Sequence, residues 1–112
     1  MKARKIEFKT VQSTDPALAG KFVYRDGIDL IIKASPPDGK GLSSDDILKA
    51  VELRSELANS KDALYLSQEN YAWLIYKLDA HVRWKVPAEV IADFITFLRE
   101  APEVEVAEAK KD

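Results

Sequence analysis

Residues 5–11, with the sequence KIEFKTV, show the first regular pattern of apolar and polar positions in the chain. Apolar or small side chains alternate there with charged ones, and a period of two places the two sets on opposite faces of an extended backbone. The pattern therefore predicts a half-buried strand. An irregular connection is expected to follow it, because proline and glycine occur between residues 14 and 20.

Residues 21–33 carry two apolar runs that are separated by Asp26-Gly27. This dipeptide tolerates positive φ values and is typical of the two-residue turn of a β-hairpin. We therefore expect two antiparallel strands with Asp26 and Gly27 as the turn. One face of this hairpin is expected to join the core, through Val23, Ile28, Leu30 and Ile32. The other face is also apolar and needs cover from a loop, a helix or another subunit; its residues are Phe22, Tyr24 and Ile31.

Residues 35–41 contain two prolines and two glycines, which predicts a linker between the sheet and a helical region. Three amphipathic helices are expected after it, from Ser43 or Ser44 to about Asn59, from Gln68 to about Val82, and from Pro87 to Pro102. The core stripe of the first helix is broad and comprises Ile47, Ala50, Val51, Leu53, Leu57 and Ala58. The order β-β-β-α-α-α predicts an α+β fold, with an N-terminal antiparallel meander of about three strands and a three-helix C-terminal half.

The composition is that of one small globular domain. The chain has 112 residues, of which 46% are hydrophobic and 32% are charged, and residues 1–102 are expected to form a single α+β domain with its own core. Residues 103–112 are mostly charged and predict a flexible tail, with a short edge strand through Val104 and Val106 as the alternative. Because the longest apolar run, at residues 71–76, is too short to cross a membrane and no signal peptide is visible, we expect a cytoplasmic protein.

The charged and reactive residues exclude several functions. The formal net charge is −2, so no overall field attracts nucleic acid or anionic lipid. The absence of cysteine removes disulfides, thiolate chemistry and cysteine-ligated metals. His81 is the single histidine, and its place near a helix end and Arg83 favours a structural role over a catalytic one. We therefore predict a protein that is not an enzyme.

Two other segments suggest ligand chemistry but have simpler explanations. Asp45 and Asp46 offer carboxylate oxygens to a divalent cation, yet acids in the first turn of a helix already stabilise its positive end. The loop at residues 36–41 places glycines around Lys40, as phosphate-binding loops do, but it lacks their spacing and the serine or threonine that follows the lysine. We predict no metal, cofactor or small-molecule substrate.

The aromatic and basic cluster between Tyr71 and Lys85 is the stronger candidate for a functional surface. Its aromatic side chains either fill gaps between helices or form a protein interface, and they are Trp73, Tyr76 and Trp84. We expect a protein partner or a second copy of the chain, as in a dimer, on this cluster or on the apolar face of the predicted hairpin. The alternative is a nucleic-acid-binding accessory factor that uses Lys2, Arg4, Lys5, Arg83 and Lys85, which the acidic net charge disfavours.

The stretch from Leu42 to Ala101 contains the segments LSSDDILKAVELRSEL, LYLSQENYAWLIYKLDAHVRW and VIADFITFLREA. It resembles small uncharacterised proteins that are encoded beside capsid and tail genes in tailed phages and prophages. These proteins pair an N-terminal strand region with three helices of this kind. The likeness covers about half of the chain and consists of apolar spacing and capping residues. It implies an accessory role in virion assembly through protein contacts and transfers no catalytic residue.

Overall fold

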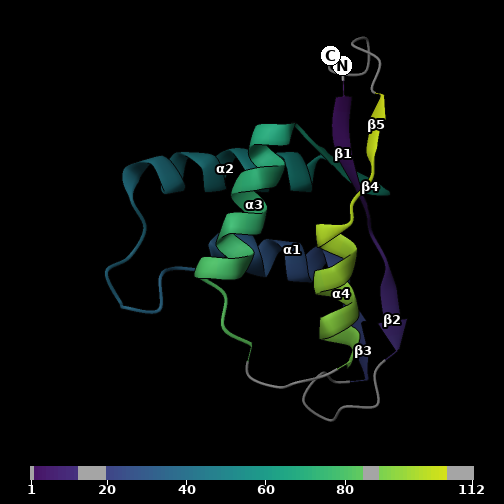
Figure 1. Ribbon diagram of the computed structural model, residues 1–112, viewed down its shortest axis with the longest axis horizontal. Helices are drawn as coiled ribbons and strands as arrows, with labels where there is room; N and C mark the ends of the chain where they lie inside the picture. The colour runs from purple at the N-terminus through teal and green to yellow at the C-terminus, as the bar shows by residue number, and fades with distance from the viewer. Residues whose placement is uncertain (1, 13–19, 85–88, 106–112) are drawn as a thin grey trace.

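The computed structural model describes residues 2–12, 20–84 and 89–105 (Figure 1). Within these residues the chain forms nine elements in the order β1 (Lys2–Glu7), β2 (Thr10–Gln12), β3 (Lys21–Val23), α1 (Tyr24–Lys33), α2 (Ser44–Ala58), β4 (Ala63–Leu66), α3 (Gln68–Ala80), α4 (Glu89–Arg99) and β5 (Glu103–Glu105). The α+β prediction is confirmed, since the strands pair antiparallel and most of the helical residues lie in the C-terminal half.

The strands form two antiparallel sheets along one side of the molecule, with the helices beside them (Figure 1). In the larger sheet β1 lies between β4 and β5, with Ile6 opposite Leu64 and Ala3 opposite Val104. In the smaller sheet β2 pairs with β3. Ile6 and Leu64 are buried towards the helices, so one face of the larger sheet belongs to the core.

The predicted hairpin across Asp26-Gly27 is wrong, because residues 24–33 form helix α1. Four apolar residues of this segment, at positions 24, 28, 31 and 32, are spaced so that they share one face of a helix. All four are buried: Tyr24, Ile28, Ile31 and Ile32. Burial of this stripe outweighs the local turn preference of the dipeptide. Only the start of the predicted first hairpin strand is extended, as β3, and it pairs with β2.

Strand boundaries also differ from the sequence pattern. The expected strand at residues 5–11 is divided into β1 and β2, because the chain leaves β1 after Glu7. The amide of Phe8 there donates to the carbonyl of Asp62 at 2.9 Å. Strand β4 was not anticipated from the apolar pattern. At the start of the tail, Glu103–Glu105 form the short edge strand β5, which was the alternative prediction for this segment. Residues 106–112 lie outside the described residues.

Helices α2 and α3 confirm the predictions made from capping and periodicity. The side chain of Ser43 accepts a hydrogen bond from the amide of Asp46, and that of Ser67 accepts one from the amide of Asn70, both at 3.1 Å. The third predicted helix corresponds to α4, although its expected start at Pro87 lies outside the described residues. Residues 34–43 contain no helix or strand, as predicted for the linker.

Three side chains tie the ends of elements together across the core. Arg25 on α1 donates to the carbonyls of Leu57 at 2.5 Å and Ser60 at 3.0 Å, at the C-terminal end of α2. The Tyr71 hydroxyl on α3 lies 2.7 Å from the carbonyl oxygen of Leu98, and Arg4 donates to the carbonyl of Ala101 at 2.7 Å. These bonds bring side-chain donors to carbonyl groups at or just after the C-terminal ends of α2 and α4, and they connect these ends to α1, α3 and β1.

Candidate interaction surface

Helix α2 exposes large aliphatic side chains on the side away from the core. The exposed fractions are 70% for Leu48, 64% for Val51 and 46% for Ile47. The core contacts of α2 come from Ala50, Leu53 and Leu57. At about 100° of rotation per residue, Leu48 and Val51 point roughly 150° away from that buried stripe. The helix therefore carries two apolar faces, of which the protein itself covers one.

The outer face has the spacing of a helix-pairing seam. Its exposed residues follow one another at intervals of four, three, four and three, and they are Ser44, Leu48, Val51, Ser55 and Ala58. We call this set the α2 strip. Such intervals keep one line of side chains facing a neighbouring helix. The large residues occupy the middle of the strip and the small residues its ends, so a partner helix can approach the ends closely.

Carboxylates line one side of the α2 strip. Asp45, Glu52 and Glu56 project on this side of α2 by helix geometry, and Glu69 of α3 joins them through Lys49. We call these four residues the acidic flank. Asn70 connects them, because its side-chain nitrogen donates to Glu52 at 2.7 Å and to Glu56 at 3.5 Å.

The charges within the acidic flank do not balance. Lys49 is the one cation among the described residues that bonds to it, and its Nζ donates to Glu69 at 3.2 Å and to the side-chain oxygen of Asn70 at 2.8 Å. Burial raises the pKa of Glu56, and the neighbouring carboxylate of Glu52 raises it further, against smaller opposing effects of Asn70 and Lys49. An additional cation at this flank would therefore be stabilised.

The opposite side of the α2 strip carries Ile47 and Arg54. The guanidinium of Arg54 lies 3.3 Å from a carboxylate oxygen of Asp29 on α1, and the other oxygen of Asp29 lies 2.9 Å from Lys33. Both cations of α2, Lys49 and Arg54, are thus paired with acids of the same chain. The strip is bordered by unbalanced negative charge on one side only.

The apolar face expected on the hairpin is covered by the protein itself. Tyr24 and Ile31 are buried on α1, and Phe22 is half-buried. The Phe22 ring packs edge to face against Tyr24 at 5.9 Å and against Phe94 of α4 at 5.1 Å between ring centroids. Helix α4 therefore covers Phe22 and Tyr24. Tyr24 and Ile31 belong to the core, and Phe22 packs against it.

The three aromatic residues of the second predicted patch contact different elements. Trp73 is half-buried and donates through its indole nitrogen to Asp46 of α2 at 3.0 Å. Trp84 is half-buried and packs against Phe94 at 6.4 Å between centroids. Tyr76 is 48% exposed, with its hydroxyl 3.2 Å from Nε2 of His81. Both tryptophans thus take the gap-filling role that was one of the alternatives.

The four described residues of the nucleic-acid alternative do not form one surface. Lys2 lies 3.9 Å from Glu103. Arg4 is held by the carbonyl of Ala101 and stacks over the Tyr71 ring at 4.8 Å. Lys5 lines a groove on the sheet, whereas Arg83 lines a separate hollow beside α1. Lys85 lies outside the described residues.

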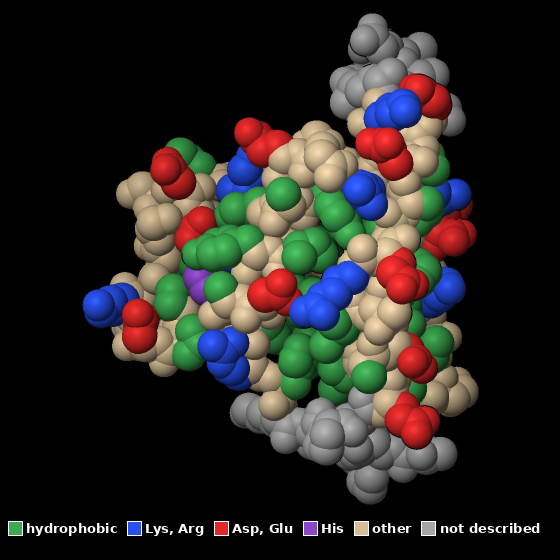
Figure 2. All heavy atoms as spheres, viewed as in Figure 1, with side chains coloured by type: hydrophobic (Ala, Val, Ile, Leu, Met, Phe, Trp, Pro, Cys, Tyr) green, Lys and Arg blue, Asp and Glu red, His purple; other side chains and the backbone are tan. Residues whose placement is uncertain are grey.

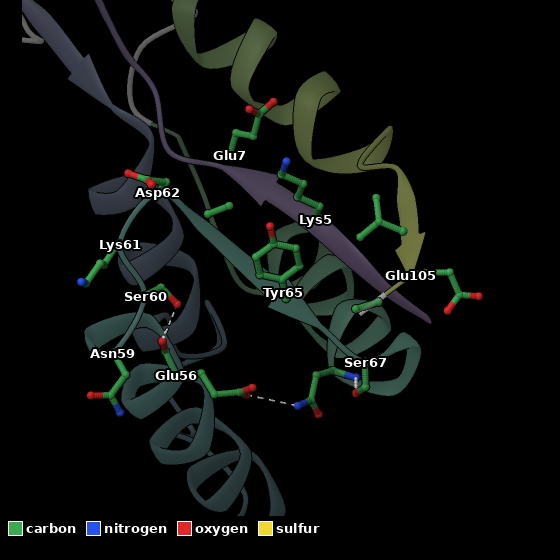
Figure 3. A pocket seen from close by; sticks show the side chains of 14 residues that line it. Lys5, Glu7, Glu56, Asn59, Ser60, Lys61, Asp62, Tyr65, Ser67 and Glu105 are labelled. Atoms are coloured by element: carbon green, nitrogen blue, oxygen red, sulfur yellow. Dashed lines mark hydrogen bonds between the residues drawn. The ribbon is translucent and has the colours of Figure 1, made fainter. Parts of the chain in front are cut away.

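The groove on the sheet has a volume of about 990 Å³. Figure 3 shows Lys5, Glu7 and Tyr65 projecting from the outer sheet face, with Glu56 and Ser60 from the end of α2 beside them. Its lining mixes both signs of charge with small apolar residues, and no set of groups converges on one point. Because Glu56 also belongs to the acidic flank, the groove and the flank adjoin.

His81 lies in a second hollow, of about 550 Å³, with Asp29 and Lys33 of α1. It is 7% exposed, and its Nδ1 has no hydrogen-bond partner in the described part of the chain. Figure 2 shows this histidine among hydrophobic side chains. Its ring contact is with Tyr76, at 5.2 Å between centroids.

Residues 2–12, 20–84 and 89–105 contain neither a metal-binding cluster nor a membrane-spanning helix. No group of three or more His, Cys, Asp or Glu side chains in these ranges is placed to hold a metal ion. Asp46, one of the two acids considered for a cation, instead accepts the hydrogen bond from Trp73. None of the helices in the described ranges combines the length and the apolar character that crossing a bilayer requires.

Comparisons of the chain with protein-family models, with curated proteins and with solved structures found no match. The candidate surface therefore depends on the geometry of α2. The apolar spacing predicted that Ile47, Val51 and Ala58 belong to the core together with Ala50 and Leu53, but the first three are exposed. The sequence does show that these apolar positions, together with Leu48, extend around more of the helix than one buried face requires, although it does not show which of them are exposed.

Proposed function

We propose that this chain is a non-catalytic protein whose work is to bind another protein through the α2 strip. The observation that carries the proposal is the outward exposure of Leu48, Val51 and Ile47 as one aliphatic surface. Scattered apolar residues are normal on a protein surface, but a contiguous strip at helix-pairing intervals is typical of a contact site. Covering it would release free energy at about 25 cal/mol for each Å² of apolar surface removed from water.

The other apolar candidates support this choice because their own chain uses them. Phe22 and Tyr24 pack on Phe94, and Trp73 is bonded to Asp46. The basic residues of the nucleic-acid alternative are dispersed, and Arg4 is bonded within the fold. Protein binding through α2 is therefore the function that the described surface supports best.

The resemblance to proteins of tailed phages suggests where the partner belongs. Within this proposal the chain would be an accessory protein of virion assembly that contacts a capsid or tail component. This part remains a prediction based on the likeness of residues 42–101. It requires that the gene lie beside capsid or tail genes, and a neighbourhood without virion genes would contradict it.

The binding proposal is tested by photo-crosslinking in cells that express the full chain. A photoreactive amino acid replaces Val51 in one version and Thr96, which is exposed on α4, in the control. We expect one protein to be crosslinked from position 51 and not from position 96. Mass spectrometry then identifies this protein, and the purified pair is assayed for binding.

In the purified assay Leu48→Ser is expected to weaken binding at least about tenfold, since it removes a central apolar contact. Thr96→Ala is the matched control and should bind as the original chain does. Crosslinking that is absent at position 51, or equal at positions 51 and 96, would contradict the proposal. Binding that survives Leu48→Ser unchanged would do the same.

A further inference from the structure

We infer that the partner of the α2 strip is an amphipathic helix whose apolar seam is bordered on one side by lysine or arginine. This inference rests on the proposed function and adds the chemistry of the partner. Its two parts, the helical shape and the basic border, depend on different observations. The spacing of the strip carries the first part, and the charge of the acidic flank carries the second.

The spacing of the strip favours a helix over other shapes. Intervals of four and three residues over Ser44–Ala58 form a straight line of contacts about four turns long. A second helix matches such a line along its whole length, because its own residues at intervals of three and four face back. The small side chains of Ser44, Ser55 and Ala58 at the ends allow larger partner residues to fit there, while Leu48 and Val51 fill the middle.

The acidic flank determines the charge of the partner. Four carboxylates border the strip on one side, and Lys49, the cation bonded to them, is already shared between Glu69 and Asn70. A lysine or arginine at the edge of the partner seam would lie beside Asp45 and Glu52. Such a pairing favours binding and raises the association rate, whereas an acidic partner would be repelled. Burial and, after it, the charge of Glu52 raise the pKa of Glu56, and a nearby cation would oppose both effects.

A second copy of the chain fits this surface poorly. In an antiparallel pair of α2 helices the same sides face each other, so the acidic flanks of the two copies would be adjacent. In a parallel pair Glu52 would lie against Ile47 of the second copy, which places a charge on an aliphatic side chain. Self-association through α2 therefore brings like charges together or desolvates one, and a partner with basic residues avoids both costs.

The test uses two synthetic helical peptides with the same aliphatic seam. One carries lysine and the other glutamate along one edge of the seam, and fluorescence anisotropy measures their binding to the full chain. We expect the lysine peptide to bind at least about tenfold more tightly at low salt. The preference should fall towards unity at about 0.5 M salt, because salt screens exposed charges.

Two variants with the same change of charge separate the flank from a general effect. Asp45→Asn with Glu52→Gln removes two carboxylates from the flank and keeps hydrogen-bond acceptors. Glu89→Asn with Glu100→Gln removes two from exposed positions on and after α4. We expect the first pair of substitutions to reduce the lysine preference at least about fivefold and the second to leave it nearly unchanged.

The outcomes separate this inference from the proposed function. Equal binding of both peptides, abolished by Leu48→Ser, would overturn the basic partner and leave the α2 strip as a contact site. If neither peptide binds while the crosslinked partner does, the inference of a helical partner is overturned, and the α2 strip remains a contact site. Concentration-dependent dimerisation that Leu48→Ser abolishes would favour a second copy and overturn the inference as well.

Discussion

Gly27 on α1 lies directly against the ring of Phe94 on α4. A Cβ atom at position 27 would be 2.7 Å from Cζ and 2.8 Å from Cε2 of Phe94, which is closer than real side chains approach. The ring is fully buried and is held by Phe22, Tyr24 and Trp84. The glycine that suggests a turn in the sequence is therefore needed for the close packing of two helices.

Gly27→Ala is expected to lower the free energy of unfolding by about 1–3 kcal/mol, because the added methyl group overpacks the core. A loss of stability would point to packing, because helix propensity alone predicts the opposite result: alanine is favoured over glycine within a helix by about 1 kcal/mol. Urea denaturation measures the change. Phe94→Leu in the Gly27→Ala background should restore part of the lost stability. Changes in unfolding free energy that simply add in the double variant would contradict the contact.

Arg25→Met is expected to lower the free energy of unfolding by about 1–3 kcal/mol. The substitution keeps an apolar stem but removes the guanidinium donor from the carbonyls of Ser60 and Leu57. The Leu57 carbonyl keeps the bond from the Ser60 amide, at 3.2 Å. Arg54→Met is the matched control, because Arg54 forms an exposed ion pair with Asp29 and such pairs contribute at most about 1 kcal/mol. Thermal unfolding of the two variants compares them, and equal effects would contradict the role of Arg25.

Glu56→Gln is expected to stabilise the protein at neutral pH. Burial and the charge of Glu52 raise the pKa of Glu56 above 4.5. Between 4.5 and the raised pKa the folded state holds a proton that the unfolded state has released, so stability falls as the pH rises through this window. The glutamine variant lacks this loss. Its advantage should be largest at pH 7 and should vanish below pH 4.5 in urea titrations, and an advantage independent of pH would contradict the explanation.

Lys77→Met is expected to change how stability depends on alkaline pH. Lys77 is fully buried, donates to the carbonyl of Ala34 and lies 5.5 Å from the centroid of the Trp73 ring. Desolvation lowers its pKa, against an opposing effect of Asp46. Between the lowered pKa and 10.5 only the unfolded state retains the proton, so the cost of burying the charged lysine is relieved and stability increases with pH.

The difference in unfolding free energy between the original chain and Lys77→Met isolates this contribution. It also removes the effect of Tyr24 and Tyr71, whose pKa values are both raised by burial and which act in the opposite direction in the same pH range. We expect the difference to move in favour of the original chain as the pH approaches 10.5. A difference that stays constant from pH 7 to 10.5 would contradict a lowered pKa.

Leu48→Ser is expected to change the free energy of unfolding by no more than about 0.5 kcal/mol, because the side chain points away from the core. Leu53→Ala, on the buried side of the same helix, should cost about 2–5 kcal/mol. Chemical denaturation of the two variants measures the contrast. A large destabilisation by Leu48→Ser would mean that the strip supports the fold and would weaken its assignment as a contact site.

Helices α2 and α3 could be predicted because their signals are local. Ser43 and Ser67 cap them, as the sequence indicated, and a capping bond depends on residues only three positions apart. The hairpin at Asp26-Gly27 was predicted from an equally local signal and was wrong. In that segment the partners that decide the structure, Phe94 above all, lie more than sixty residues away in the chain.

The α2 strip could not be assigned from periodicity alone. Ile47, Val51 and Ala50 are all apolar residues at helical spacing, and the sequence does not state which side of the helix the rest of the protein covers. Strand β4 was missed for a related reason. Its four residues pair with β1, whose nearest partner residue lies more than fifty positions away, and such a short apolar run is compatible with either element type.

Local signals in the sequence are enough to predict the α+β class, the positions of the capped helices and the scarcity of reactive side chains, because these depend on composition and on neighbours within a few residues. Three features became visible only in the folded chain: residues 24–33 form a helix, the predicted hairpin face is covered by the protein, and one face of α2 meets solvent. Each of these outcomes depends on apolar burial between segments far apart in the chain, and burial is a property of the folded arrangement rather than of any local pattern.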